Sequence, residues 1–219
     1  PVEATARPAL FWQYLELTKP NVVWLILMST MVGFYVASPD ALSATLLLHT
    51  VAATALLAAG TGSLNQWWER DLDRKMRRTE GRPLPSGRIS ANGSLVFGIA
   101  VSIVGLAWMG FGVNWLSFWV GLATLLSYVL VYTPLKTKTP LATFLGAFPG
   151  AAPLLLGWTA VQGTLSLQAW VLFFILFLWQ FPHFYAIAWI YREDYARAGI
   201  KMLPVVDGDG DSTSRQIVC

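Results

Sequence analysis

The sequence predicts an all-α polytopic membrane protein, and three observations support this fold class. Only 12% of the 219 residues are charged, about half the share of a soluble domain. Several apolar runs approach the roughly 20 residues that a helix needs to cross a bilayer. The lysines and arginines fall only in alternate connections between these runs. Together these features predict six membrane-spanning helices.

The six predicted spans follow one another with short connections on one side of the membrane and longer charged connections on the other. In chain order they cover residues 20–38, 42–66, 91–111, 114–133, 140–161 and 167–190. The first carries no charged residue, and the second runs directly into a polar stretch. The third and fourth are parted only by FGVN. The fifth is rich in glycine and alanine, which allow close helix packing, and the sixth is strongly aromatic.

The basic residues predict the orientation in the membrane. Two precede the first span, seven lie between the second and third, two between the fourth and fifth, and four follow the sixth, which accounts for all 15. Basic loops are retained in the cytoplasm. Both termini and the two charged loops are therefore expected on the cytoplasmic side, most simply of a bacterial inner (plasma) membrane.

Composition excludes some kinds of site. The single cysteine, Cys219, leaves no intramolecular disulfide framework and no cysteine-based zinc site. The N-terminus lacks the pattern of a removable signal peptide. The formal net charge of +3 is too small to indicate a partner, and nucleic acid is not expected to be one.

The most polar stretch is NQWWERDLDRKMRRTEGRPLPSGR, residues 65–88. Asn65, Glu69 and Asp73 are spaced i, i+4, i+8, so a continuing helix would place them on one ridge. Polar groups in a membrane helix are costly and indicate a functional site. Amide and carboxylate oxygens are ligands of Mg²⁺. The ridge therefore predicts a metal site, with an ordinary helix end as the alternative.

Seven bases accompany the ridge: Arg70, Arg74, Lys75, Arg77, Arg78, Arg82 and Arg88. Arginine and lysine bind phosphate oxygens. Basic loops also lie against anionic lipid in general, and for the bases alone that interpretation is favoured. Lys19 has two interpretations, a lipid-interface anchor or part of a phosphate pocket, and the anchor is favoured slightly. His49 is interpreted as structural.

The motifs resemble those of the UbiA superfamily of intramembrane prenyltransferases. N-x-x-x-E-x-x-x-D at 65–73 is similar to the superfamily's first aspartate-rich motif, and YTPLK, from Tyr132 to Lys136, is similar to its Y-x-x-x-K motif. GAFPGAAPLLLGW and WQFPHFYAIAWIYREDYARAGIKMLPVV resemble the branch that farnesylates haem. The resemblance extends over nearly the whole chain from about residue 15.

The resemblance implies a Mg²⁺-dependent reaction through an allylic carbocation. The farnesyl group of farnesyl diphosphate would be transferred to a vinyl group of haem b, with water added. The superfamily fold is a nine-helix bundle, so residues 1–219 would be a single domain with its C-terminal part missing. The implied partners are farnesyl diphosphate, haem b and the bilayer, with haem A synthase or oxidase-assembly proteins beyond them.

The resemblance also implies roles for individual residues. Mg²⁺ ligands would be Asn65, Glu69 and Asp73 for one ion, and Asp194 with Glu193 for a second. Groups that hold the diphosphate would be Arg74, Arg78, Tyr132, Lys136 and Lys138. His183 would contact haem, although a helix–helix hydrogen bond is an equal alternative. The chain departs from the superfamily pattern at Glu69, usually aspartate, and at Tyr191 and Tyr195, where the second motif often has aspartates.

Two other functions remain open from the sequence. A prenyltransferase with an aromatic or quinone-precursor acceptor would need the same diphosphate site. A transporter would use the acidic ridge as part of an ion path. The transporter predicts polar residues through the other half of the membrane, where the spans carry almost none.

Overall fold

The computed structural model describes residues 9–38, 41–207 and 210–218, and within these ranges its regular elements are helices. They are α1 (Leu10–Leu17), α2 (Pro20–Ala37), α3 (Ala44–Asp73), α4 (Ala91–Gly112), α5 (Trp115–Leu126), the π-helical turn η1 (Ser127–Tyr132), α6 (Thr133–Leu135), α7 (Ala142–Gln162), α8 (Leu167–Ile190), α9 (Arg192–Ala198), α10 (Leu203–Val206) and α11 (Asp211–Val218).

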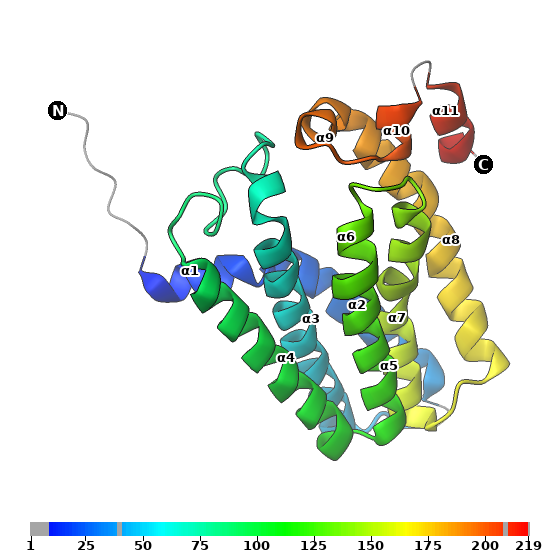
Figure 1. Cartoon of the computed structure of the whole chain (residues 1–219). Helices are drawn as coiled ribbons and strands as arrows, with labels where there is room; N and C mark the ends of the chain where they lie inside the picture. The colour runs from blue at the N-terminus through cyan, green and yellow to red at the C-terminus, as the bar shows by residue number, and fades with distance from the viewer. Residues whose placement is uncertain (1–8, 39–40, 208–209, 219) are drawn as a thin grey trace.

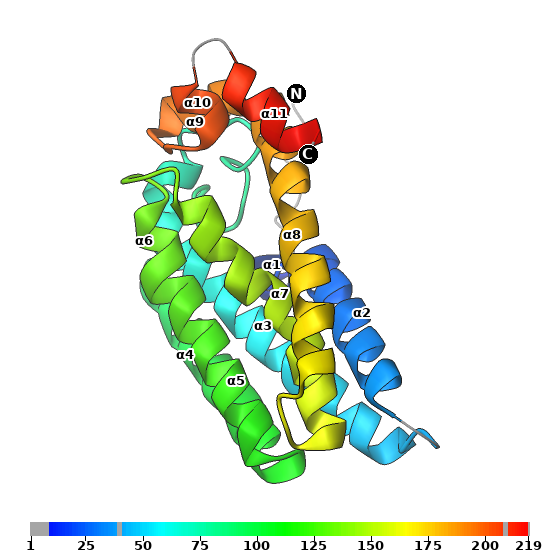
Figure 2. The same ribbon diagram turned by 90° about the vertical axis from the view of Figure 1, so that its right-hand side faces the viewer.

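Among the described residues, six helical segments are long and apolar enough to cross a membrane, which confirms the predicted fold class. They run side by side in a bundle, as both views show (Figures 1 and 2). The sixth span has the predicted bounds, and the others differ by a few residues. The largest difference is in the second, where α3 continues from the predicted end at 66 to Asp73. The ridge residues therefore lie on one helix.

Polar caps mark where three of the spans begin. The side chains of Ser43, Ser90 and Asn114 each accept a hydrogen bond from a backbone N–H three residues later, at 3.3, 3.1 and 2.8 Å. These bonds satisfy backbone donors that the first turn of a helix leaves free. Each cap therefore helps to set the start of α3, α4 or α5.

Helix α7 forms the centre of the bundle and packs against α2, α5 and α8. In its membrane window 72% of the residues are buried, a far larger share than in any other span. A Cβ on Gly157 would overlap the backbone of α2 at Thr30, so this crossing requires glycine. Small residues in this span thus permit close helix packing, as predicted.

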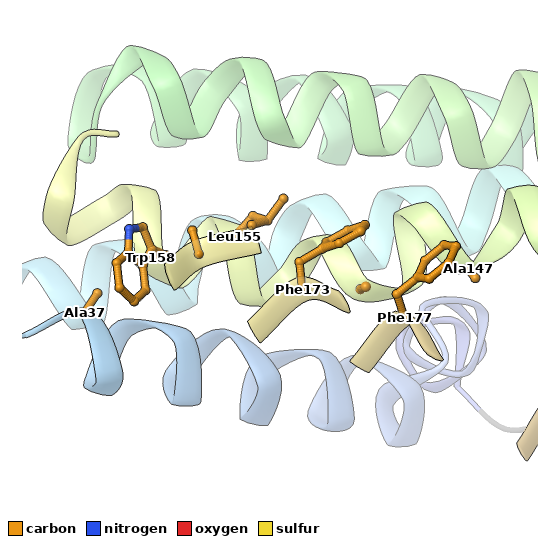
Figure 3. Close-up of a cluster of buried hydrophobic side chains, with 8 residues drawn as sticks. Ala37, Ala147, Leu155, Trp158, Phe173 and Phe177 are labelled. Carbon is orange, nitrogen blue, oxygen red and sulfur yellow. The ribbon is translucent and has the colours of Figure 1, made fainter. Parts of the chain in front are cut away.

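A hydrophobic cluster joins α2, α7 and α8 (Figure 3). Trp158 of α7 lies near Ala37 of α2, and Phe173 and Phe177 of α8 stack at 5.7 Å between ring centroids. These side chains are buried. The cluster holds α8 against the central helix.

The charged connections gather at one end of the bundle, uppermost in Figure 1. The end of α3, the loop 74–90, α6 and the segment 191–206 lie together there, and α1 crosses beneath the loop (Figure 1). The backbone N–H of Lys201 donates to the carbonyl of Lys136 at 2.8 Å, which joins two of these segments. Arg88 binds the carboxylate of Glu16 through two bonds of 2.9 and 3.1 Å, which ties the loop to α1.

Candidate active site

A cavity of about 200 Å³ lies at this polar end, among α3, η1, the loop 74–90 and the segment 191–206. The ridge residues Asn65, Glu69 and Asp73 line one wall of it. All three are buried, with exposed fractions of 1%, 6% and 1%. The structure therefore brings together the three polar groups that the helical spacing placed on one face.

Each ridge residue contacts a base from a different segment of the chain. The pairs are Lys19 Nζ with Asn65 Oδ1 at 2.8 Å, Lys136 Nζ with Glu69 Oε1 at 2.7 Å, and Arg82 Nη1 with Asp73 Oδ2 at 2.8 Å. A buried carboxylate without a counter-charge is strongly unfavourable. The bases compensate the ridge electrostatically and also line the same cavity.

Lys19 lies in the cavity wall, so the lipid-anchor interpretation favoured by the sequence is wrong. It separates α1 from α2 with φ 56°, and among the described residues it is the one non-glycine residue with a positive φ. This left-handed conformation is costly for a residue with a side chain. Burial, and then the nearby charge of Arg82, lowers the pKa of Lys19 to about 7.

The pKa of Lys136 is shifted in the opposite direction from that of Lys19. Burial by itself lowers the pKa of an ammonium group, but the Glu69 carboxylate and the phenols of Tyr132 and Tyr128 favour the charged form. The net effect raises the pKa of Lys136 well above its usual value. Lys136 is therefore a permanent positive charge in the cavity wall.

The π-helical turn η1 positions the tyrosines and fixes the orientation of Asn65. Thr133 Oγ1 donates to the carbonyl of Tyr128 at 2.8 Å and accepts from Asn65 Nδ2 at 3.2 Å. Since the single hydroxyl proton is used on the carbonyl, the oxygen of Thr133 must accept, and Asn65 must present its amide NH₂ to it. Asn65 Oδ1 is thereby directed to Lys19 and the cavity. Such π-turns often occur at functional sites.

A glycine of the central helix makes room for one of these tyrosines. A Cβ on Gly146 of α7 would overlap the ring of Tyr132. Lys136 Nζ lies 4.4 Å from the centroid of the same ring. The close approach of α7 therefore helps to hold Tyr132 between the bundle and the bases.

Three of the five groups predicted to hold the diphosphate line the cavity: Arg78, Tyr132 and Lys136. Arg74 does not, because α3 ends at Asp73 and the next side chain turns off the ridge. It donates to Asp71 at 3.2 Å and to the carbonyl of Pro85 at 3.1 Å. Lys138 is exposed and also lies outside the cavity lining.

Neither acid predicted for a second metal lines the cavity. Glu193 is exposed. Asp194 is buried, but its carboxylate pairs with Arg197 and accepts a hydrogen bond from the backbone N–H of Arg78 at 3.3 Å. Asp194 is therefore bound to other protein groups and not directed to the ridge.

The two histidines lie outside the cavity lining. His183 is exposed on α8 and stacks on Trp179, with ring centroids 4.7 Å apart. His49 accepts a hydrogen bond from Trp108 Nε1 at 2.9 Å, which agrees with its structural interpretation. Contact between His183 and haem stays a prediction.

The sequence reasoning did not assign Arg82, Tyr128, Thr133 or Tyr195 to the site, although each lines the cavity or bonds to a ridge residue. Tyr128 could have been found, because it lies four residues before Tyr132 in the same span. Arg82 was only one of seven bases between the second and third spans. Nothing in its spacing distinguishes it from the others.

The ridge fits a divalent cation by the chemistry of its donors. Amide and carboxylate oxygens are hard ligands that suit Mg²⁺. Lys136 contacts one carboxylate oxygen of Glu69, and Arg82 contacts one of Asp73, whereas a carboxylate can accept through both of its oxygens. Among the described residues no group of three or more His, Cys, Asp or Glu side chains could hold a metal. Water or a substrate phosphate would complete the coordination.

A family comparison and a search of known proteins point to the same family. The UbiA prenyltransferase family matches residues 26–219. A protoheme IX farnesyltransferase of Solibacter usitatus is 55% identical over 214 residues, which cover 94% of this chain and 73% of that protein. One of Koribacter versatilis is 46% identical over 221 residues, covering 98% of this chain and 71% of that protein.

Solved structures share the fold at low identity. A UbiA homolog from Archaeoglobus fulgidus bound to GPP and Mg²⁺ has a TM-score of 0.77 at 21% identity, over 94% of this chain and 72% of that one. The apo structure of a UbiA homolog from Aeropyrum pernix has a TM-score of 0.75 at 18% identity, over 90% of this chain and 76% of that one.

Proposed function

Because the chain belongs to the UbiA prenyltransferase family, we propose that it transfers the farnesyl group of farnesyl diphosphate to a vinyl group of haem b. The names of the relatives that are 55% and 46% identical support this donor and this acceptor. The observation that carries the proposal is the cavity, where a ridge of buried oxygen ligands faces several bases. That combination suits a metal-bound diphosphate.

The charges in the cavity favour an anionic ligand. Among the described residues that line it, four are bases, Lys19, Arg78, Arg82 and Lys136, and two are acids, Glu69 and Asp73. The lining therefore has two more basic than acidic groups. Lysine and arginine bind phosphate oxygens directly, and a fixed positive site stabilises charge that develops on a leaving diphosphate.

Asn65, Glu69 and Asp73 would hold the Mg²⁺ ion. When bound there, Mg²⁺ neutralises negative charge on the phosphate oxygens and orients the leaving group. The residues of the chain act around it. Lys136 keeps Glu69 in place, Arg82 keeps Asp73 in place, and the Thr133 hydroxyl holds the Asn65 amide in its orientation.

The proposed reaction begins when the bond between the farnesyl carbon and the diphosphate oxygen breaks. The electron pair leaves with the diphosphate, where the four bases receive the charge. The resulting allylic cation is attacked by the vinyl double bond of haem b. Water then adds to the new cation beside the porphyrin and loses a proton, which gives a hydroxyethylfarnesyl side chain. The rings of Tyr128 and Tyr132 lie in the cavity wall and can stabilise a cation by their π faces.

The cavity would face the cytoplasm of a bacterium, with the protein in the inner membrane. All the bases of the cavity lie at the end of the bundle that carries the charged connections. Positive loops are retained in the cytoplasm. In this orientation the charged head of the substrate meets the bases while its apolar tail lies toward the bilayer.

An ion-transport function receives no support from the other half of the bundle. Three buried hydroxyl groups there bond to the backbone of their own helices: Thr50 to Leu46 at 2.7 Å, Ser102 to Gly98 at 2.7 Å, and Thr159 to Leu155 at 2.8 Å. Each of these hydroxyl protons is donated to a backbone carbonyl of the same helix. These groups do not extend the acidic ridge across the membrane.

The test is a product assay with the purified chain in lipid nanodiscs. Haem b, farnesyl diphosphate and Mg²⁺ are supplied, and we expect mass spectrometry to show haem that has gained one farnesyl group and one hydroxyl group. A parallel reaction supplies 4-hydroxybenzoate as the acceptor. Prenylated 4-hydroxybenzoate without prenylated haem would contradict the proposed acceptor and leave the diphosphate site intact.

His183 is tested separately through haem binding. If it contacts haem from the exposed side of α8, His183→Ala should alter the absorption spectrum of bound haem b without changing the affinity for farnesyl diphosphate. His49→Ala is the matched histidine control and should leave the spectrum unchanged. Identical spectra for wild type and His183→Ala would remove His183 from the haem site.

A further inference from the structure

We infer that this active site holds one divalent cation, and that Arg78, positioned by Asp194, supplies the positive charge on the other side of the cavity. The inference rests on the proposed function, because it takes a diphosphate as the ligand. It concerns how that ligand's charge is divided between metal and protein.

The carboxylates that reach the cavity in the described part of the chain come from one helix. The two carboxylates in the described lining, Glu69 and Asp73, both belong to the α3 ridge. The segment 191–206 contributes Tyr195, Ile200 and Met202 to the lining. Mg²⁺ is held by carboxylates, carbonyls, phosphates and water. That segment therefore offers no carboxylate to a second ion.

Asp194 is the nearest candidate, and both of its carboxylate oxygens are used. Oδ1 pairs with Arg197 of the same helix, and Oδ2 accepts from the backbone N–H of Arg78 at 3.3 Å. The residue is 9% exposed and does not line the cavity. Its effect is to hold the loop after α3 against α9.

Arg78 is placed by this contact and does line the cavity. Its guanidinium carbon lies 5.0 Å from the centroid of the Tyr191 ring, which orients the side chain by a cation–π contact. A planar guanidinium can give two parallel hydrogen bonds to a phosphate. Arg78 therefore offers, on the side away from the ridge, both charge and directed donors.

Electrostatics oppose a second metal at the same place. The lining already has two more bases than acids before any metal binds. One divalent cation on the ridge adds positive charge that a diphosphate can balance. A second would lie close to Arg78 without a carboxylate of its own to offset the repulsion between the two positive charges.

The number of ions is measured by titration of the full chain with Mn²⁺ in the presence of inorganic diphosphate. Electron paramagnetic resonance reports free Mn²⁺, so bound ions are counted without turnover. We expect one Mn²⁺ per protein. Asp194→Asn should keep that count, whereas Asp73→Asn should abolish binding. Two ions in the wild type, or loss of an ion in Asp194→Asn, would overturn the inference.

The role of Arg78 is measured as affinity for inorganic diphosphate by calorimetry, at saturating Mn²⁺. Arg78→Met should weaken binding about ten- to a hundred-fold, which corresponds to one charge-assisted hydrogen bond or two. Arg78→Lys should recover part of the loss. Arg77→Met is the matched control, because Arg77 is an exposed neighbour outside the lining. The affinity of this variant for inorganic diphosphate should equal that of the wild type.

Asp194→Ala separates positioning from ligation. Loss of its bond to the Arg78 backbone should weaken diphosphate binding while the Mn²⁺ count remains one. Unchanged diphosphate affinity in both Asp194→Ala and Arg78→Met would refute the role of this pair. Neither measurement uses haem or a prenyl chain, so failure of the proposed acceptor would appear only in the product assay.

Discussion

The two walls of the cavity are built in different ways. One is a single long helix, α3, whose regular turns present Asn65, Glu69 and Asp73 in a row. The other belongs to the short helix α9 and the connection that follows it, which are held by a small apolar cluster of Met76, Ala198 and Ile200. The first wall supplies metal ligands at fixed spacing. The second covers the cavity and carries an acid that binds protein groups.

Among the substitutions that test this comparison, Asp73→Asn should reduce turnover most, because it removes a ridge charge that pairs with Arg82. We expect turnover to fall by about 10²- to 10³-fold, as for loss of a group that stabilises transition-state charge. Product formation by mass spectrometry measures it. Asp71→Asn is the matched control, since Asp71 is exposed and lies off the ridge, and it should retain turnover. Similar losses in both variants would contradict a special role for the ridge.

Lys136→Met should have the next largest effect, because Glu69 would lose its buried partner. Removal of one member of a buried ion pair costs about 3–5 kcal/mol. We therefore expect a lower thermal midpoint in addition to reduced turnover. Lys138→Met removes an equal charge from an exposed position and should change neither. A thermal midpoint unaltered by Lys136→Met would show that the pair does not support α3.

Thr133→Val tests how the ridge is oriented. The variant keeps the shape of the side chain but cannot accept the amide proton of Asn65 or donate to Tyr128. Loss of a group that orients a metal ligand typically weakens metal affinity about ten- to a hundred-fold. We expect about a tenfold weaker Mn²⁺ affinity, recovered by Thr133→Ser. Equal losses in the Val and Ser variants would indicate a packing effect alone.

Gly146→Ala should have the smallest effect. The added methyl group would displace the ring of Tyr132 from the cavity wall. Overpacking of this kind costs about 1–3 kcal/mol, and we expect a few-fold weaker affinity for diphosphate by calorimetry. Gly81→Ala adds the same group where no atom lies within 4 Å, so it serves as the control. Full affinity in Gly146→Ala would mean that Tyr132 does not contact the ligand.

The difference between the walls also explains what the sequence could predict. Apolar length and helical spacing are local properties, so the six spans and the shared face of Asn65, Glu69 and Asp73 followed from them. The partners of the ridge depend on tertiary contacts. Lys19 comes from a turn between helices and Arg82 from a loop, where no periodicity assigns a direction to the side chain.

The ends of helices limit such predictions in the same way. Arg74 would have followed the helical pattern if α3 had continued, but α3 ends at Asp73 and the side chain binds Asp71 and Pro85. Asp194 has a sequence position suited to a ligand, yet its oxygens bind Arg197 and Arg78. Residues in short helices or at helix ends take their directions from neighbours that are distant in sequence.

The left-handed turn at Lys19 sets stability against activity at one position. It follows the last residues of α1, where a left-handed residue after a helix is usually glycine. Lys19→Gly would relieve roughly 1–2 kcal/mol of backbone strain and remove the ammonium group that Asn65 Oδ1 accepts from. A directed-evolution screen for heat resistance alone would therefore favour a substitution that damages the enzyme, and engineering of a more robust variant should hold this codon fixed.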